Sequence, residues 1–154
     1  MKGVGSAGAL TGKRFWRLYV HSVYSASADL TLDTLEFCGD ASGPDLTDGS
    51  EAAFRAMAQD YFEQSGDSWV PYTPFTPLAG RQGQSFWFSE AVPNWIGWRF
   101  DAPTLINEVR WSATYLNSSP RDVTIQSSVD GQTWLDEWSE SGVYGTGPKT
   151  TTRP

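Results

Sequence analysis

Short segments in which apolar and polar side chains alternate, separated by turn-forming residues, constrain this chain more than any other feature. Apolar side chains occupy every second position in residues 14–20, and residues 95–100 and 107–115 repeat this pattern. A period of two is typical of a half-buried β-strand, since successive side chains of a strand point to opposite faces. The expected inward-facing residues are Trp16, Leu18, Val20, Ile96, Trp98, Phe100, Val109, Trp111 and Ala113.

More strands and a hairpin are expected along the rest of the chain. The additional strands are predicted at residues 31–37, 84–89, 123–129 and 133–138. Asp130 and Gly131 form a hairpin turn between the last two. No strand–helix–strand alternation occurs, which disfavours a parallel sheet. The predicted fold class is therefore all-β: an antiparallel β-sandwich of the jelly-roll kind with one short helix.

Residues 51–62 are the only segment with helical spacing. Ser50 could cap this helix, and Glu51 would lie in its first turn. The apolar stripe of the helix is expected to pack on the core and comprises Phe54, Met57, Ala58 and Tyr61.

Length and charge limit the organisation and the partners of the chain. Its 154 residues amount to about one domain. We expect a sandwich at residues 13–140, a Gly- and Ala-rich flexible arm at residues 1–12 and a loose tail at residues 141–154. The net charge of −7 and the scattered basic residues disfavour nucleic acid and membrane surfaces as partners. No run of 18 apolar residues is present to span a membrane.

No set of residues in the sequence assembles a catalytic site, and we predict that the chain is not an enzyme. His21 is the only histidine and Cys38 the only cysteine, and nothing in the sequence ties them together as base and nucleophile. Cys38 is expected to be a buried apolar residue, and a single cysteine cannot form an internal disulfide. Asp136, Glu137 and Glu140 are close in sequence, but solvated surface charge is favoured over a glycosidase pair.

A Gly-rich loop contains the only weak metal candidates, Asp40, Asp45 and Asp48. Their carboxylates could offer oxygen ligands to a structural Ca²⁺. The spacing differs from that of an EF-hand loop, so a turn-forming role is favoured. No other cofactor is expected.

Aromatic residues in a proline-containing loop are the candidates for ligand contact. Residues 69–80 carry three prolines and cannot form a central strand. The aromatic side chains expected near the surface are Trp69, Tyr72, Phe75 and Trp95, with Asp67, Arg81 and Gln82 as polar partners. An exposed aromatic ring can stack on a sugar, but such a patch more often marks a protein interface. In contrast, the strand positions assigned to the core include Trp16, Trp87, Trp98, Trp111 and Trp134.

Five segments, in this order, resemble the discoidin or coagulation-factor C-type family, whose members are galactose-binding-like jelly rolls. These segments are Arg14–Val20, Glu51–Asp60, Ser85–Ser89, Asn94–Pro103 and Ser118–Trp134. The chain departs from the family where it has Phe54, Arg55 and Ala56 in place of the usual Phe-Asp-Gly, which weakens any transfer of a metal site. The cysteine pair common in extracellular members is also absent.

The resemblance implies binding rather than catalysis, since members bind glycans, lipids or proteins and many occur in phage tail and baseplate proteins. We expect a non-catalytic structural or interaction module of a virion: a phage tail, baseplate or capsid-decorating protein assembled in the host cytoplasm. Its expected partners are other virion proteins and copies of itself. The alternative is a glycan-binding module that recognises a host surface polysaccharide. Both expectations rest on analogy at the level of the fold.

Overall fold

The computed structural model describes residues 11–25, 29–47, 52–59, 73–75, 87–89, 92–113, 115–145 and 147–154. Three short helical segments are present there: α1 (Ala52–Arg55), η2 (Thr73–Phe75) and η3 (Leu116–Ser118). The strands are β1 (Lys13–Val23), β2 (Leu30–Leu32), β3 (Thr34–Cys38), β4 (Ala56–Ala58), β5 (Trp87–Ser89), β6 (Asn94–Thr104), β7 (Glu108–Ser112), β8 (Pro120–Ser128), β9 (Leu135–Glu140) and β10 (Lys149–Thr152). The predicted all-β class is confirmed.

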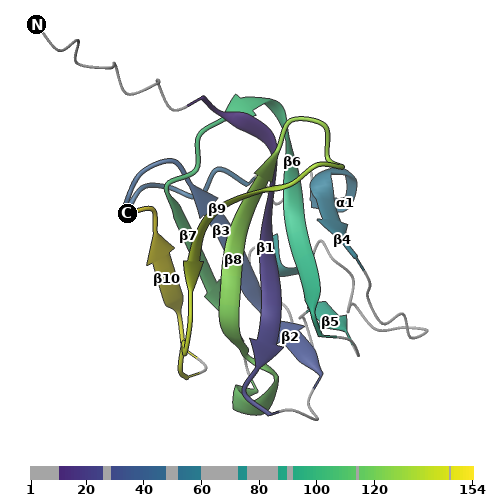
Figure 1. The fold of residues 1–154 in the computed structure, drawn as a ribbon, viewed down its shortest axis with the longest axis vertical. Coiled ribbons are helices and arrows are strands. Elements are labelled where there is room, and N and C mark those ends of the chain that lie inside the picture. The colour runs from purple at the N-terminus through teal and green to yellow at the C-terminus, as the bar shows by residue number, and fades with distance from the viewer. Residues whose placement is uncertain are drawn as a thin grey trace, which may run out of the picture.

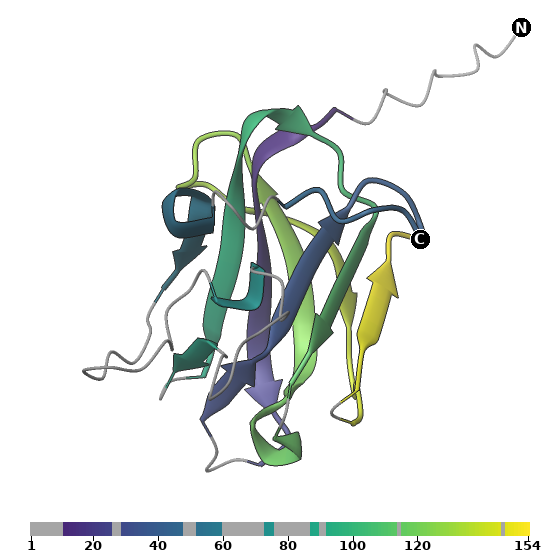
Figure 2. The same ribbon diagram turned by 180° about the vertical axis from the view of Figure 1, so that it is seen from behind.

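These strands form two facing layers (Figures 1 and 2). One layer is a five-stranded sheet with the order β4-β6-β1-β8-β9. The other layer contains the sheet β10-β7-β3, and the short pair β2-β5 continues it because only Asp33 separates β2 from β3. Every strand pairing described is antiparallel. The chain is therefore an antiparallel β-sandwich.

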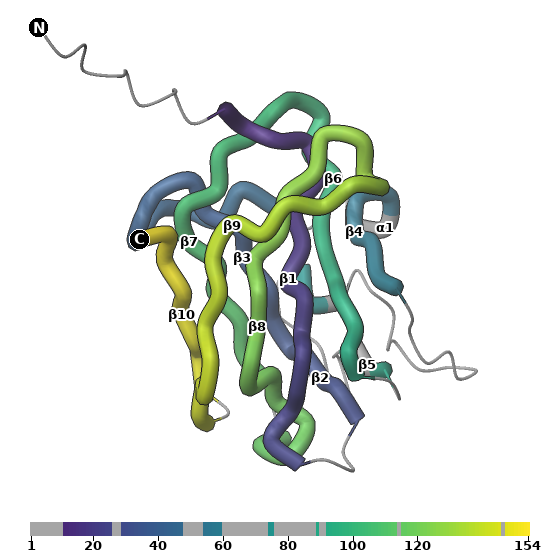
Figure 3. Tube along the Cα trace, viewed as in Figure 1, coloured from purple at the N-terminus to yellow at the C-terminus, as the bar shows by residue number. Residues whose placement is uncertain are grey.

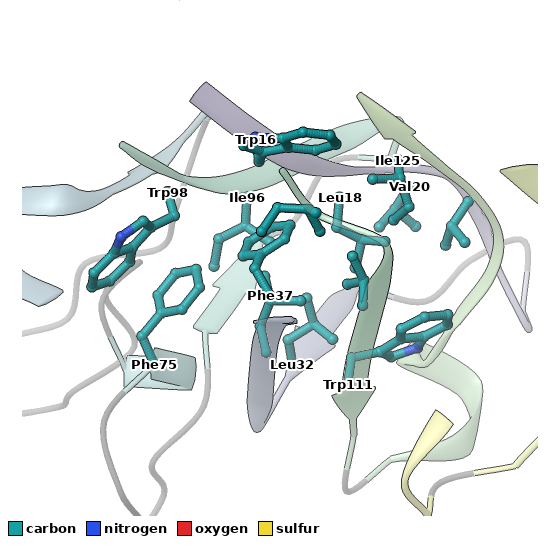
Figure 4. Packing of buried hydrophobic residues seen from close by; sticks show 14 of the residues in the cluster. Trp16, Leu18, Val20, Leu32, Phe37, Phe75, Ile96, Trp98, Trp111 and Ile125 are labelled. Atoms are coloured by element: carbon teal, nitrogen blue, oxygen red, sulfur yellow. The ribbon is translucent and has the colours of Figure 1, made fainter. Parts of the chain in front are cut away.

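The core lies between the two layers and follows the predicted alternation (Figure 4). From β1, Trp16, Leu18 and Val20 point inward and have no exposed surface. All nine residues expected to face inward from the alternating segments 14–20, 95–100 and 107–115 are buried. Burial of an apolar side chain of this size contributes roughly 1.5–3 kcal/mol to the free energy of unfolding. These residues therefore hold the layers together and fix which face of each strand meets solvent.

The prediction of a helix over residues 51–62 is wrong beyond Arg55. Residues Ala56–Ala58 form β4, an edge strand that pairs with β6. Phe54, expected to pack on the core, is 80% exposed. Backbone pairing with a long neighbouring strand satisfies the N–H and C=O groups of this segment, and tertiary context of this kind overrides a weak helical propensity. Tyr61 lies outside the described residues.

The expectation of a loose C-terminal tail is wrong for residues Lys149–Thr152. They form β10, which pairs with β7 at the edge of the second layer. Next to β10, the Arg153 guanidinium lies 2.7 Å from Glu137 Oε2, and both side chains are less than one-fifth exposed. Backbone hydrogen bonds and this ion pair order a segment whose composition alone predicts a coil. Residues 1–10 of the expected N-terminal arm lie outside the described part of the chain.

Candidate binding site

The outer face of the five-stranded sheet carries a group of aromatic and polar side chains in contact with one another. Strand β1 runs through the middle of this sheet, between β6 and β8 (Figure 3). Because its even-numbered residues from Trp16 to Val20 face the core, Arg17, Tyr19 and His21 point outward. The same alternation that builds the core therefore places a cation and two rings in a row on the outside.

Neighbouring strands complete this group of side chains. In the register of the sheet, Arg17 lies between Gly97 of β6 and Gln126 of β8. Trp95, two residues before Gly97, pairs with Tyr19 and is half-buried. Side chains directly opposite on one face of an antiparallel pair interact, so β1, β6 and β8 together set the positions of these groups.

Two tryptophan rings and a tyrosine surround the guanidinium of Arg17. Its Cζ lies 3.9 Å from the ring centroid of Trp134, 4.8 Å from that of Trp95 and 5.4 Å from that of Tyr19. The two indole centroids are 5.8 Å apart and inclined by 43°. A guanidinium over an aromatic face gains about 0.5–2 kcal/mol from the ring quadrupole. We call Arg17, Tyr19, Trp95 and Trp134 the Arg17 cluster.

Partial burial changes the acidity of this arginine. Removal from water disfavours the charged form and lowers the pKa of Arg17 to about 10, although Tyr19 and Asp136 act in the opposite direction. The guanidinium is still protonated at neutral pH. It therefore keeps its charge in a place where that charge is poorly hydrated.

A chain of hydrogen bonds extends from the cluster across β8 to β9. Arg17 Nε donates to Gln126 Oε1 at 2.6 Å, and Gln126 Nε2 donates to Asp136 Oδ1 at 2.6 Å. These bonds fix the orientation of the amide, since its oxygen and nitrogen have different partners. The face thus presents a guanidinium, an amide and a carboxylate beside two indole rings.

Gly97 is required for the close approach of β6 to β1 at this point. A Cβ at position 97 would lie 2.4 Å from the backbone oxygen of Trp16 and 2.8 Å from Cβ of Arg17. Both contacts are shorter than real Cβ atoms show. Absence of a side chain here lets Arg17 pass over β6 toward Trp95.

His21 is part of the same face, and among the described residues its hydrogen-bond partner is a hydroxyl rather than an acid. Its Nε2 shares a hydrogen bond with Thr124 Oγ1 at 2.8 Å, and Thr124 Oγ1 shares another with Ser139 Oγ at 2.8 Å. The Tyr19 ring lies edge-on to the imidazole, with centroids 4.9 Å apart. The imidazole of His21 is thus part of a network of hydroxyl groups on this face.

No protein-family model, curated protein or solved structure matches the chain. The resemblance to the discoidin family therefore stays a prediction, and the site has to be assigned from its own geometry. None of the helices that the structure describes is long and apolar enough to cross a membrane.

Of the residues predicted to contact a ligand, the structure places only Trp95 in the cluster. The prediction for Phe75 is wrong: this side chain is 4% exposed and packs between Phe37 and Trp98 in the core (Figure 4). The short helical turn η2 directs the ring inward, which proline content alone does not reveal. The other five predicted residues lie outside the described part of the chain: Asp67, Trp69, Tyr72, Arg81 and Gln82.

Arg17, Tyr19 and Trp134 are the members of the cluster that the sequence analysis assigned elsewhere or did not name as ligand contacts. Trp134 was expected in the core, but β9 begins one residue later, at Leu135, and the indole is half-buried beside Arg17. The pairing of β8 with β9 shifts register between Ile125 and Gln126. Alternation on the two sides of this shift is out of phase, so the inward-facing positions near Trp138 do not predict which way Trp134 points. The outward orientation of Arg17 was predictable, since it lies between the core residues Trp16 and Leu18 on the same strand.

The loop predicted as a weak metal site uses one of its carboxylates to shape a turn. Asp45 Oδ1 accepts hydrogen bonds from the backbone N–H of Thr47 at 2.9 Å and of Phe37 at 3.2 Å, and from Thr47 Oγ1 at 2.7 Å. The backbone oxygen of Asp40 accepts from the Gly43 N–H at 2.9 Å. Asp48 lies outside the described residues. Among the described residues, no three His, Cys, Asp or Glu side chains are grouped to hold a metal ion.

Proposed function

We propose that this chain is a non-catalytic binding module that holds a carbohydrate against the outer face of its five-stranded sheet. The observation that carries the proposal is the Arg17 cluster, in which Trp95 and Trp134 lie beside a guanidinium, an amide and a carboxylate. Sugars offer apolar C–H faces edged by hydroxyl groups. Aromatic rings suit the C–H faces, and fixed donors and acceptors suit the hydroxyl groups.

The polar edge of the site supports a sugar as the partner. Arg, Trp and Tyr are enriched at protein interfaces as well. What favours a sugar is that Gln126 is held in one orientation beside the half-buried rings, by a 2.6 Å hydrogen bond from Arg17 and a 2.6 Å hydrogen bond to Asp136. Fixed donors and acceptors next to a ring suit the hydroxyl groups and the C–H face of a sugar.

The chemistry of the reactive residue types supports binding rather than catalysis. Burial raises the pKa of the Cys38 thiol to about 11, which disfavours the nucleophilic thiolate at neutral pH. His21 shares its hydrogen bond with a threonine hydroxyl that is itself bonded to Ser139. In the part of the chain that the structure describes, neither residue is arranged as a member of an activated pair.

Glycan-array binding and calorimetry of the full chain test the proposal. The variant Trp95→Ala is expected to lose at least tenfold in affinity for any glycan that binds, because one stacking ring is removed. Tyr144→Ala is the matched control, since Tyr144 is exposed and contacts Tyr24 rather than the cluster. Thermal melting confirms that each variant is folded. No binding to any glycan, or unchanged binding by Trp95→Ala, would contradict the proposal.

A separate observation favours a second role, as a structural module held by other proteins. The rings of Tyr24 and Tyr144 are both exposed and meet edge to face, with centroids 4.9 Å apart. The backbone N–H of Ser25, next to Tyr24, donates to the backbone oxygen of Asn117 at 3.1 Å. This bond joins the Tyr24 loop to the loop that contains a third exposed tyrosine, Tyr115. Exposed tyrosines on joined loops suit a protein contact, since tyrosine is enriched at interfaces.

The setting proposed for this second role is a virion, in which a discoidin-type jelly roll contacts other virion proteins or copies of itself. The support is the sequence resemblance and the pair of exposed tyrosines. Replacing Tyr24 and Tyr144 together by serine should reduce incorporation into assembled particles while leaving the melting temperature unchanged. Normal incorporation of that double variant would contradict this role for the tyrosine pair.

A further inference from the structure

We propose that the carbohydrate bound at this face is acidic, with an anionic substituent on its sugar ring that the guanidinium of Arg17 binds. This inference rests on the proposed function and names the chemical class of its ligand.

The terminal amino groups of Arg17 are the donors that such a ligand would use. Nε is occupied by Gln126 at 2.6 Å, whereas Nη1 and Nη2 have no hydrogen-bond partner in the part of the chain that the structure describes. A guanidinium presents paired N–H groups that match two oxygens of one carboxylate or sulfate. Arg17 therefore has unused donors in the geometry that an anion requires.

Arg17 also lacks a direct counterion among the described residues. The ion pairs described there involve Arg55, Arg110, Arg121 and Arg153, but not Arg17. Asp136 is the nearest acidic group in the network, and its Oδ1 accepts from the intervening Gln126 amide. A partly desolvated cation without a paired anion is stabilised when an anion binds to it, in line with the lowered pKa of Arg17.

The position of Arg17 against the two indole rings places the anion and the sugar ring close together. The Arg17 Cζ lies within 5 Å of the centroids of both Trp95 and Trp134. A sugar ring that covers the outer surface of either indole would bring a substituent on that ring to the edge of the guanidinium. A single sugar unit of the polymer would then both stack on an indole and place its anionic group on the guanidinium.

The other charges near Arg17 include one that attracts an anion, Arg99, and one that repels it, the exposed carboxylate of Asp136, which accepts a hydrogen bond from Gln126. Arg99 follows Gly97 by two residues, lies on the same face and is exposed. Asp101 is engaged by Arg55, with Nη2 and Oδ2 2.6 Å apart. The net charge of −7 repels a polyanion, but at physiological ionic strength this repulsion is largely screened beyond about 8 Å. Affinity must therefore come from local contacts.

Calorimetry of the full chain with matched polysaccharides tests the inference. Polygalacturonate is compared with the same polymer after reduction of its carboxyl groups to alcohols, and dextran sulfate is compared with dextran. The expected result is about 10- to 100-fold tighter binding to the charged member of at least one pair. The pair that shows the preference tells whether the anion is a carboxylate or a sulfate. Polyglutamate, a polyanion without sugar rings, should bind at least tenfold more weakly than the preferred polymer.

Two variants connect the preference to Arg17. Arg17→Lys keeps the charge but loses the paired donors, so the preference for the charged polymer should fall toward onefold while thermal melting shows a folded protein. Arg121→Lys is the matched control, since this exposed arginine lies at the Pro120 end of β8, which pairs with Ser22 and Val23 rather than with Arg17, and should retain the preference.

The outcomes separate the inference from the function on which it rests. Equal binding of charged and neutral polymers overturns the acidic-sugar inference and leaves carbohydrate binding intact. A full preference retained by Arg17→Lys, or binding of polyglutamate as tight as that of the charged polysaccharide, also overturns the inference. A glycan array on which nothing binds overturns carbohydrate binding itself.

Discussion

The indole Nε1 of Trp138 donates a hydrogen bond to Oγ1 of Thr151 at 2.9 Å and so joins the edges of the two layers. Trp138 belongs to β9, the edge strand of the five-stranded sheet, and Thr151 belongs to β10 of the facing layer. Thr151 Oγ1 in turn donates to Glu140 Oε1 at 3.1 Å. Both Trp138 and Thr151 are buried. A buried indole N–H needs a hydrogen-bond acceptor inside the protein, and Thr151 Oγ1 supplies it.

Thr151→Val tests this connection with a side chain of nearly the same shape. It removes the acceptor for a buried indole N–H, and leaving such a group unpaired costs about 1–3 kcal/mol. Thr150→Val is the control, because Thr150 is exposed on the same strand. Urea denaturation should show a lower free energy of unfolding for Thr151→Val and a change within about 0.5 kcal/mol for Thr150→Val. Equal stability of the two variants would show that the bond contributes nothing.

Gly97→Ala should destabilise the centre of the five-stranded sheet. The added Cβ meets the backbone oxygen of Trp16, which belongs to β1 and cannot rotate away as a side chain could. Overpacking of this kind costs about 1–3 kcal/mol. Gly147→Ala is the control, since a Cβ there has no atom within 4 Å. Denaturation curves in which both variants behave as the wild type would refute the close approach of β1 and β6.

Phe75→Ala distinguishes a core residue from a ligand contact. The ring lies 4.8 Å from that of Trp98 and 6.3 Å from that of Phe37, between centroids. Truncation of a buried phenylalanine lowers the free energy of unfolding by about 3–5 kcal/mol. Phe54→Ala removes a ring that is 80% exposed, so its effect should stay within about 0.5 kcal/mol. A loss of stability for Phe75→Ala as small as the one expected for Phe54→Ala would place Phe75 outside the core.

Asp130 should give the protein a specific loss of stability in acid. Hydrogen bonds from the backbone N–H of Thr133 and Gln132 and from the Ser128 hydroxyl lower the pKa of Asp130 from 3.8 to about 2. Because the folded state holds the carboxylate form, this contribution is present above pH 3.8 and is lost as the pH falls toward 2.

Two measurements check the Asp130 prediction. An NMR titration should give a midpoint near pH 2 for the Asp130 carboxyl. The stability advantage of the wild type over Asp130→Asn should shrink as the pH falls through this window, since the other carboxylates are common to both proteins. A constant difference between the two denaturation midpoints would contradict the assignment.

The face of each long strand was predictable, because alternation along a strand depends only on neighbouring residues. Trp16, Leu18 and Val20 predict a strand with one buried face, and all three are buried in the structure. Arg17 and Trp95 were therefore outward-facing by pattern alone. Their meeting was not predictable, because contact between β1 and β6 depends on which strands pair and in which register.

Alternation along each segment was enough to predict a sandwich of antiparallel strands, since periodicity is a local property that each segment carries independently. Three features follow from the folded structure instead: Ala56–Ala58 pairs as an edge strand, Phe75 turns inward and Trp134 contacts Arg17. Each of these outcomes depends on a partner distant in sequence. The energy of backbone pairing or ring packing with that partner exceeds the weak preference of the segment alone.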